Sequence, residues 1–372
     1  FAPPGNGLGF YQGRAVFVPR AIPGDEVSVR VEKVGKDYIL ADLEEILTAA
    51  AGRRQPPCPH YETCGGCDLL HLHHQDQLRL KEQMLAETLA RTGVNLRLDT
   101  SFGANEFAYR HRFFLHREGR QLGFLRRRRH QLVPLDHCPL LAPGLSGLLE
   151  RLASFDLPQD LTGIYGLANQ AGDYAASGAA AGRRRLSLPG LSGSLYEDYG
   201  SGRLELDAAA FAQCNPAVTA RLQADLAGLC RPRAAVVELY GGSGTFSLAL
   251  AAVAGRVRVY ESDAGAVARG RRNAAANKFD NLEFFAAKLG REALPGDCEV
   301  LVVDPPRAGL EVEVISEIMA SRAESLLYIS CNPATLARDL RRLGPAFTPR
   351  LLRAYDMYPG TTHLEVLALL ER

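Results

Sequence analysis

One stretch decides the fold: Ala234-Ala-Val-Val-Glu-Leu-Tyr-Gly-Gly-Ser-Gly-Thr245. Its first seven residues are mostly apolar and predict a buried strand, and the glycines after them favour a tight turn. An Ala- and Leu-rich helical segment follows. Beyond it, apolar runs alternate with helical segments as far as Arg342. Strands that alternate with helices predict a parallel, doubly wound sheet.

The later strands of this sheet are expected where apolar residues cluster between helical segments: residues 256–260, 282–285, 299–303 and 326–330. Two further strand candidates, residues 350–355 and 364–370, have no helical segment between them. They therefore predict an antiparallel pair that closes the sheet.

The glycine turn and an acid beyond it indicate a cofactor that contains a nucleoside. Gly241, Gly242 and Gly244 let the backbone approach a ligand and place it against the N-terminus of the next helix. Glu261 ends the second strand, where a carboxylate can bind both ribose hydroxyls. A dinucleotide fingerprint would place Gly or Ala where this chain has Ser247. S-adenosylmethionine, with an adenosine and no phosphate, fits better than a nicotinamide cofactor; an ordinary tight turn is the other alternative.

Two short motifs follow neighbouring strands and are expected in one crevice. Asp304-Pro-Pro-Arg307 follows one strand and Ser330-Cys-Asn-Pro333 the next. Ligands of open α/β sheets lie beyond the carboxyl ends of the strands. Cys331 precedes a helix expected over residues 334–342, whose positive N-terminal end would favour a thiolate. Alone, such a cysteine is more often an inert buried thiol.

A thiol and a methyl donor at one site indicate methylation of a uracil ring at carbon 5. That carbon is too weakly nucleophilic to attack a sulfonium methyl group unaided. A thiolate that adds to carbon 6 makes the ring an enolate, and carbon 5 can then attack. A base must remove the carbon 5 proton before the thiol leaves. Cys331 is the candidate nucleophile, and Glu365, which opens an otherwise apolar strand, is the candidate base, provided that burial raises its pKa. The alternative for Glu365 is a solvent-exposed position at a strand end.

The eight cysteines fall into two groups. Cys58, Cys64 and Cys67 crowd one loop, Cys138 is the best fourth ligand, and the others are dispersed. Four thiolates fit an iron–sulfur cluster or structural zinc, and the spacing leaves both open. This arrangement predicts an intracellular protein with one metal site instead of a secreted, disulfide-stapled one.

The first 48 residues predict a small β-barrel, with short strands at residues 14–19, 26–31 and 38–43. The region has five basic and seven acidic residues, so strong phosphate binding is not evident. Four aromatic residues are candidates for stacking on bases, and at least two of them are expected to pack in the core instead: Phe10, Tyr11, Phe17 and Tyr38.

The middle of the chain carries a helix at about residues 75–92 and a hairpin at residues 112–116 and 121–125. Residues 175–182 are mostly Ala and Gly and are expected to form a loose loop. Eight arginines and three acids lie between Glu106 and Asp136, so this segment is either a phosphate contact or a solvated face. His60, His71, His73 and His74 are expected on the surface or facing RNA.

Length and charge set wider limits. A chain of 372 residues is expected to hold two or three domains. Its net charge of +1 does not indicate nucleic-acid binding, and its 38 Arg against five Lys make arginine runs less informative. No apolar run is as long as a membrane span. Since the first residue is Phe1, the natural N-terminus is expected to precede it.

Four segments together resemble the RNA uracil-C5 methyltransferases, which make 5-methyluridine in ribosomal and transfer RNA: residues 211–215, 304–309, 328–339 and 363–365. The resemblance runs nearly end to end, and the Ser-Cys-Asn-Pro segment is specific to that family. It implies an α/β fold: a Rossmann-like S-adenosylmethionine-dependent methyltransferase domain at residues 208–372. A TRAM module, which is a small OB-like β-barrel, is implied at residues 1–48, and a central α+β domain with the cysteine cluster at residues 49–207.

The resemblance also assigns roles to single residues. Cys331 is implied as the nucleophile and Glu365 as the base. Four residues are implied to bind S-adenosylmethionine: Gln213, Tyr240, Glu261 and Asp304. Asp304 would also lie beside the flipped uracil. Two positions depart from the family pattern: Thr245 stands where some members have Asn, and Lys288 cannot accept the hydrogen bond that Asp or Asn accepts from adenine.

The cysteine pattern and the partners complete the expectation. Many members carry Cys-x5-Cys-Gly-Gly-Cys with a distant fourth Cys, which implies a 4Fe-4S cluster on Cys58, Cys64, Cys67 and Cys138, with structural zinc as the alternative. RNA is the implied partner, ribosomal more than transfer RNA, for a cytoplasmic monomer without membrane contact. A transfer-RNA methyltransferase and a non-catalytic, cluster-bearing RNA-binding protein are the other readings. The intact Cys331, Glu365 and glycine turn favour an enzyme.

Overall fold

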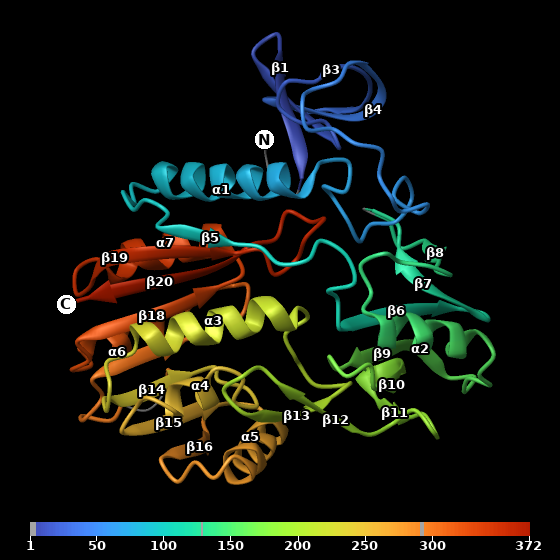
Figure 1. Ribbon diagram of the computed structural model, residues 1–372. Helices are drawn as coiled ribbons and strands as arrows, with labels where there is room; N and C mark the ends of the chain where they lie inside the picture. The colour runs from blue at the N-terminus through green and yellow to red at the C-terminus, as the bar shows by residue number, and fades with distance from the viewer. Residues whose placement is uncertain (1–4, 128, 291–293) are drawn as a thin grey trace.

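The computed structural model describes residues 5–127, 129–290 and 294–372. Within these ranges the strands form an eight-stranded, a six-stranded and a four-stranded sheet and a two-stranded ribbon. Figure 1 shows the four-stranded sheet at the top, the six-stranded sheet on the right and the eight-stranded sheet on the left. No helix in the described part of the chain is long and apolar enough to cross a membrane.

The four-stranded sheet has the order β1-β2-β4-β3. Its strands are β1 (Asn6–Tyr11), β2 (Arg14–Pro19), β3 (Glu26–Val34) and β4 (Tyr38–Thr48). The sequence did not predict β1, because its two glycines weaken the strand pattern. Phe10, Tyr11 and Tyr38 are exposed and Phe17 is half-buried, so the prediction that at least two of the four pack in the core was wrong.

The six-stranded sheet has the order β11-β10-β9-β6-β7-β8. It consists of β6 (Arg112–Glu118), β7 (Gln121–Leu125), β8 (Leu132–Pro134), β9 (Leu161–Ala168), β10 (Tyr174–Ala180) and β11 (Arg185–Ser187), with α2 (Pro143–Ala153) against β9 and β10. The predicted hairpin is β6 and β7. The prediction of a loose loop at residues 175–182 was wrong, because most of it is β10. Small residues are needed there: a Cβ on Gly178 would lie 2.5 Å from a methyl group of Leu161.

The eight-stranded sheet has the order β16-β15-β14-β17-β18-β20-β19-β5. Its strands are β5 (Thr100–Phe102), β14 (Ala235–Leu239), β15 (Arg256–Glu261), β16 (Leu282–Ala286), β17 (Val300–Val303), β18 (Ser325–Ser330), β19 (Thr348–Tyr355) and β20 (Glu365–Glu371). From β16 to β18 all pairs are parallel, whereas β20 is antiparallel to β18 and β19. The doubly wound sheet and its antiparallel closure are confirmed.

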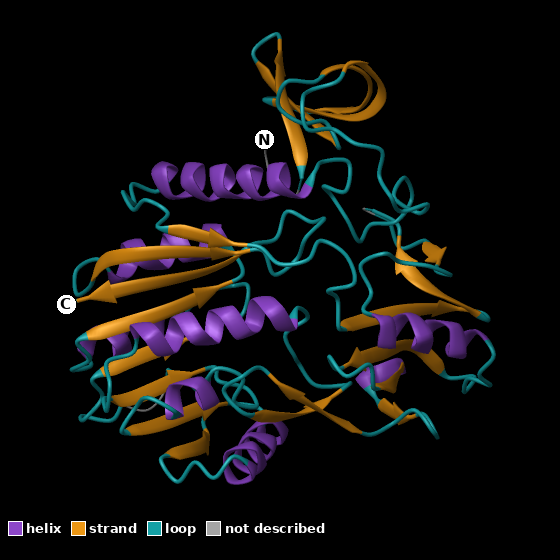
Figure 2. Cartoon of the chain, viewed as in Figure 1, coloured by secondary structure: helices purple, strands orange, loops and turns teal. Residues whose placement is uncertain are grey.

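Helices cover both sides of this sheet (Figure 2). They are α1 (His74–Arg91), α3 (Pro216–Leu229), α4 (Ser247–Ala251), α5 (Ala264–Ala276), α6 (Val312–Ala320) and α7 (Pro333–Leu343). The ribbon of β12 (Ser194–Asp198) and β13 (Arg203–Asp207) packs on α5, and a short 3-10 turn, Ala181–Arg183, follows β10. Side chains of Asn215, Asp263 and Asn332 cap the first turns of α3, α5 and α7.

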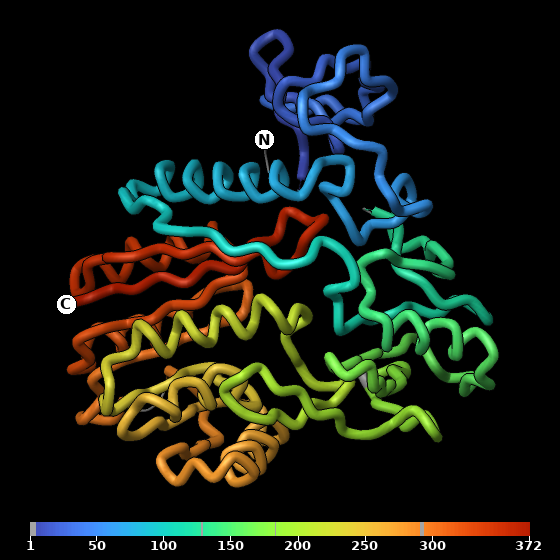
Figure 3. Tube along the Cα trace, in the orientation of Figure 1, coloured from blue at the N-terminus to red at the C-terminus, as the bar shows by residue number. Residues whose placement is uncertain are grey.

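Two elements that precede the six-stranded sheet in the chain, α1 and β5, belong in space with the eight-stranded sheet. α1 packs on α7, and β5 pairs with β19, although the sequence groups both with the central region. Figure 3 traces the chain from α1 along β19 and on to β6. This path brings α1 and the cysteine-rich segment near the carboxyl ends of the parallel strands.

Two glycines of α2 predict opposite changes in stability when replaced by alanine. At Gly147 a Cβ meets nothing within 4 Å, so Gly147→Ala gains helix propensity and raises the free energy of unfolding by about 0.5–1 kcal/mol. At Gly144 a Cβ would lie 2.7 Å from the carbonyl oxygen of Gly172, so Gly144→Ala lowers it by about 1–3 kcal/mol. Thermal and urea unfolding measure both; equal effects would contradict this packing of α2.

Candidate active site

Three neighbouring parallel strands end at one edge of the eight-stranded sheet, here called the carboxyl edge. Tyr240 follows β14, Asp304 follows β17 and Cys331 follows β18. Since β20 is antiparallel to β18, its first residue lies at the same edge: Ser330 pairs with Val366, which places Glu365 next to the Cys331 segment. The structure thus brings together Asp304 and the candidate nucleophile and base that the sequence predicted, Cys331 and Glu365.

Glu365 and Asp304 are two carboxyl groups close enough to affect each other's charge, Glu365 buried and Asp304 half-buried. Glu365 is only 3% exposed, so the solvent-exposed alternative is excluded. Burial, and then the negative charge of Asp304, raise the pKa of Glu365 well above its ordinary value, while Arg307 opposes the shift. Burial also raises the pKa of Asp304 to about 7. Both groups can therefore hold a proton near neutral pH.

Cys331 is half-buried, and its thiol is protonated at neutral pH. Burial first, and then the charges of Glu365 and Asp304, raise the pKa of Cys331 to about 11 against the opposing effect of Arg307. The direction of this shift contradicts the prediction that the position before α7 favours a thiolate. The side chain of Asn332 accepts a hydrogen bond from the backbone amide of Ala334 at 3.1 Å. One N–H group at the start of α7 is therefore already hydrogen-bonded and does not face Cys331 alone.

A cavity of about 240 Å³ opens beside Cys331. One wall is formed by the segments that follow β17 and β18, which supply Arg307 and Asn332. The other wall comes from α1 and from the segment before β20, and its residues include Lys81, Met84, Thr362 and His363. The thiol therefore faces a space that has both polar and apolar walls and room for one nucleobase.

The glycine turn after β14 is shaped for close approach of a ligand. Gly242 and Gly244 have φ values of +57° and +96°, and a Cβ on Gly241 would lie 2.3 Å from Val259. Tyr240 also has a positive φ of +63°, a conformation that costs a non-glycine residue energy and is frequent at functional sites. The Glu261 carboxylate accepts hydrogen bonds from the amides of Gly242 at 3.2 Å and Asp263 at 2.8 Å, which fixes it beside the turn.

Sequence reasoning missed two buried polar groups near this edge. Glu238, inside β14, is fully buried, and burial raises its pKa to about 8. One of its carboxyl oxygens accepts from the Ser247 hydroxyl, and the other has no partner in the described part of the chain. The side-chain amide nitrogen of Asn215, two residues after the buried Gln213, also lacks a hydrogen-bond partner among the described residues. A carboxylate within an apolar run was a usable signal for Glu238, as it was for Glu365.

The four predicted cysteines line one small cavity: Cys58, Cys64, Cys67 and Cys138. Burial raises the pKa of each thiol, and Cys138 raises it further for the other three. Among the described residues, no group of three or more His, Cys, Asp or Glu side chains is placed to hold a metal ion. The prediction of a surface position for nearby His71 was wrong: it is buried and bonded to Tyr61, and burial lowers its pKa to about 3.

The arginines between residues 106 and 136 are less exposed than their number suggests. Arg120, Arg126 and Arg129 are exposed, and Arg128 lies outside the described residues. Arg110 stacks on Phe124, Arg117 donates to the carbonyl of Pro158, and Arg127 pairs with Asp68. A phosphate contact here would thus rest on a few side chains, one in the β6–β7 turn and the others between β7 and β8.

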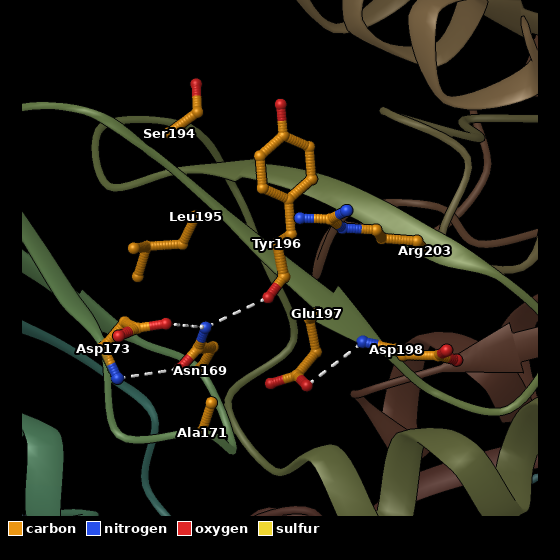
Figure 4. A pocket seen from close by; sticks show the side chains of 9 residues that line it. All are labelled: Asn169, Ala171, Asp173, Ser194, Leu195, Tyr196, Glu197, Asp198 and Arg203. Carbon is orange, nitrogen blue, oxygen red and sulfur yellow. Dashed lines mark hydrogen bonds between the residues drawn. The ribbon is translucent and has the colours of Figure 1, made fainter. Parts of the chain in front are cut away.

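A second cavity of about 320 Å³ lies between the turn that joins β9 to β10 and the β12–β13 ribbon, and hydrogen bonds join several of the residues that line it (Figure 4). The amide of Asn169 donates to Asp173 and to the carbonyl of Tyr196, both within 3.2 Å. The Glu197 carboxylate accepts from the side chain and backbone of Gln170. Since its polar groups are paired with one another, we regard this cavity as structural.

Comparisons with known proteins agree on one family. The family model for tRNA (Uracil-5-)-methyltransferase matches residues 203–296 and 294–372, and the TRAM domain model matches residues 1–43. A curated relative, the 23S rRNA (uracil(1939)-C(5))-methyltransferase RlmD of Shewanella amazonensis, is 33% identical over 99% of this chain and 93% of its own. The RlmD of Halomonas elongata is 34% identical over 96% of this chain and 85% of its own.

A solved structure shows the same fold over nearly the whole chain. It is the crystal structure of Pyrococcus abyssi tRNA (uracil-54, C5)-methyltransferase in complex with S-adenosyl-L-homocysteine. Its TM-score is 0.79 at 24% identity, with 98% of this chain and 97% of that chain covered.

Opposite charges beside Cys331 predict opposite changes in its reactivity. Alkylation requires the thiolate, so its rate rises with pH towards a pKa of about 11. Glu365→Gln removes a charge that raises this pKa and speeds alkylation at mildly alkaline pH, whereas Arg307→Met removes a charge that lowers it and slows alkylation. Iodoacetamide labelling, followed at the Cys331 peptide by mass spectrometry, measures both. Changes of the same sign would contradict the described electrostatics.

Proposed function

The chain belongs to the RNA uracil-C5 methyltransferases, and we propose that it methylates carbon 5 of a uridine in 23S ribosomal RNA with S-adenosylmethionine as the methyl donor. The observation that carries this is the meeting of Cys331 and buried Glu365 beside a nucleobase-sized cavity at the carboxyl edge. The names of the RlmD relatives favour ribosomal RNA. Transfer RNA is the second candidate, because the Pyrococcus abyssi protein of like fold is named for it.

The proposed mechanism begins with a uridine that leaves its stack and enters the cavity. Asp304, which is close enough to Cys331 to raise its pKa, takes the thiol proton. The sulfur of Cys331 then bonds to carbon 6, and the ring electrons move onto carbon 5 and oxygen 4. S-adenosylmethionine, when bound, supplies an electrophilic methyl group to carbon 5.

Elimination completes the proposed reaction. Glu365 removes the proton from carbon 5, the double bond between carbons 5 and 6 returns, and the carbon–sulfur bond breaks. Asp304 gives its proton back to the departing thiolate, so the net proton released by the reaction rests on Glu365. Burial suits Glu365 to this step, because a raised pKa makes the carboxylate a stronger base.

The donor site is proposed at the glycine turn. Glu261, fixed by two backbone amides, would accept hydrogen bonds from the ribose hydroxyls. Tyr240 and Gln213, which flank the turn and α3, would contact the remainder of the donor, and Asp304 would meet its reacting end. At Gly242 a Cβ would meet nothing within 4 Å, so the backbone of the turn is open to a ligand there.

We propose a division of labour that follows the three regions of the sequence. Residues 1–48 form an RNA-binding TRAM module, whose exposed Phe10 and Tyr11 are available for stacking on bases. Residues 49–207 add the cysteine cluster and the exposed arginines, and residues 208–372 carry the catalysis. With ribosomal RNA as its partner, the protein would act as a monomer in the cytoplasm.

We also propose that Cys58, Cys64, Cys67 and Cys138 bind a 4Fe-4S cluster. Support comes from their shared cavity and from the charge of Cys138, which adds to burial in raising the pKa of the other three thiols, a cost that cluster iron would remove. A structural zinc would need all four sulfurs about 2.3 Å from one point. Methyl transfer is redox-neutral, so the cluster would act here by joining the loop at residues 58–67 to Cys138.

Methylation of RNA tests the proposed activity. Wild-type protein with methyl-labelled S-adenosylmethionine should label 23S rRNA at a uridine, and transfer RNA much less. Cys331→Ala should abolish labelling by removing the nucleophile. Glu365→Gln should instead accumulate a covalent protein–RNA adduct, because the methylated ring cannot lose its carbon 5 proton. Nuclease mapping and denaturing gels measure these products; no transfer to either RNA would refute the proposal.

Metal analysis tests the cluster. Protein purified without oxygen should contain about four iron and four sulfide per chain. Cys138→Ser should lose most of the iron, because one ligand of the set is removed. Cys230→Ser, at a buried cysteine far from the cavity in sequence, is the matched control and should retain it. Stoichiometric zinc without iron would favour the alternative.

A further inference from the structure

The segment that leads into Glu365 is held in place by other parts of the chain. Residues 356–364 connect β19 to β20, and we call them the base connection. They supply Thr362 and His363 to the wall of the cavity and end at the candidate base. Most of the connection is buried although it is neither helix nor strand. Its conformation must therefore be fixed by partners elsewhere.

The cysteine loop supplies one set of partners. The amides of Asp68 and Leu69, directly after Cys67, donate to the carbonyl oxygen of Gly360 at 2.8 and 2.9 Å. One Asp68 carboxylate oxygen accepts from the amide of Thr362 at 3.4 Å. Arg127 pairs with the other carboxylate oxygen and donates to the carbonyl of Cys67. The base connection is thus tied to the backbone beside a cluster cysteine.

Gly360 shows how closely the two segments approach. Its φ is +79°, and a Cβ there would lie 2.9 Å from Leu70 and 3.8 Å from the sulfur of Cys67. A larger residue there would require the Leu70 side chain to shift and would be strained at this positive φ. The contact therefore depends on the cysteine loop being in its folded position.

The opposite side of the connection rests on α1. The Gln77 side chain accepts from the amide of Gly360 at 2.7 Å. Buried Lys81 donates to Asp356 at 2.6 Å and to the carbonyl of Tyr358 at 3.0 Å. The hydroxyl of Tyr109 donates to the carbonyl of Pro359 at 2.9 Å. The base connection is thus hydrogen-bonded to α1 and Tyr109 as well as to the loop at Asp68 and Leu69.

We propose that the cysteine loop positions the catalytic base: an assembled four-cysteine site holds Asp68 and Leu69 against Gly360, and this contact sets where Glu365 stands over the substrate. Asp68 is a positioning residue, since it touches the connection and not the substrate. The inference rests on the proposed function. It gives the cluster a role in methylation that involves no electron transfer.

Two variants with matched controls test this contact. Asp68→Ala removes the carboxylate from Thr362, and Asp136→Ala is its control, because Asp136 bonds to His60 of the same loop at 2.7 Å without reaching the connection. Gly360→Ala forces a Cβ against Leu70. Gly190→Ala is its control, because Gly190 has a similar φ of +74° and an open surrounding.

Misplacing Glu365 should slow proton removal more than any earlier step. Asp68→Ala and Gly360→Ala should lower kcat by up to about 100-fold. They should accumulate the covalent RNA adduct, as Glu365→Gln does, while KM and the affinity for S-adenosylmethionine change little. The two controls should behave as wild type. Wild-type turnover without adduct in both variants, at full iron content, would overturn the proposal.

Hydrogen exchange gives a measurement that needs no activity. Removing the iron from wild-type protein should speed amide exchange in residues 356–364, and Asp68→Ala and Gly360→Ala should do so with iron bound. Unchanged exchange after iron loss would overturn the positioning role even if methylation is observed. Faster exchange in a protein that methylates no RNA would instead uphold the contact and refute the proposed function.

Discussion

Parallel pairing of β14, β17 and β18 is the constraint on which the site depends. It brings the ends of three strands to one edge, so that Tyr240, Asp304 and Cys331 meet although about ninety residues separate the first from the last. The strands are buried on both faces, which makes this register costly to change. A fourth group reaches the same edge only because β20 runs the other way. A parallel strand in that place would carry Glu365 to the far edge.

Three carboxyl groups near this edge have little compensation from positive charges: only Arg307 lowers the pKa of one of them, Glu365. Glu238 and Glu365 are buried and Asp304 is half-buried, and loss of solvation raises the pKa of each. Such groups destabilise a fold, because a buried carboxylate lacks the solvation it has in water. Arg307 offsets part of this effect for Glu365 and also lowers the pKa of Cys331. A balance of this kind suits the proposed mechanism, which moves two protons within one turnover, one from sulfur and one from carbon.

Much of the fold and the site followed from sequence because local patterns agreed with the final packing. The apolar runs of the eight-stranded sheet, and Cys331 and Glu365 at their ends, are examples. Predictions failed where long-range contacts decide the outcome. Small residues in β10 indicated a loop, yet they are required because Leu161 packs over Gly178. The histidine at position 71 lies in a polar-looking segment, but Tyr61 and the surrounding chain bury it. The thiolate prediction for Cys331 considered the helix and not the carboxyl groups facing it.

Strand pairing alone does not fix the position of the Glu365 side chain. As the first residue of β20, it pairs with Tyr355 of β19 on one side and precedes the first pair with β18 on the other, so the sheet pairs it on one side only. The remaining restraint has to come from residues 356–364, and these are bonded to α1 and to the cysteine loop. Proton abstraction from carbon is sensitive to the distance and direction of the base. We therefore infer that the cysteine loop can influence a reaction with no net electron transfer, because it is bonded to the segment that ends at Glu365.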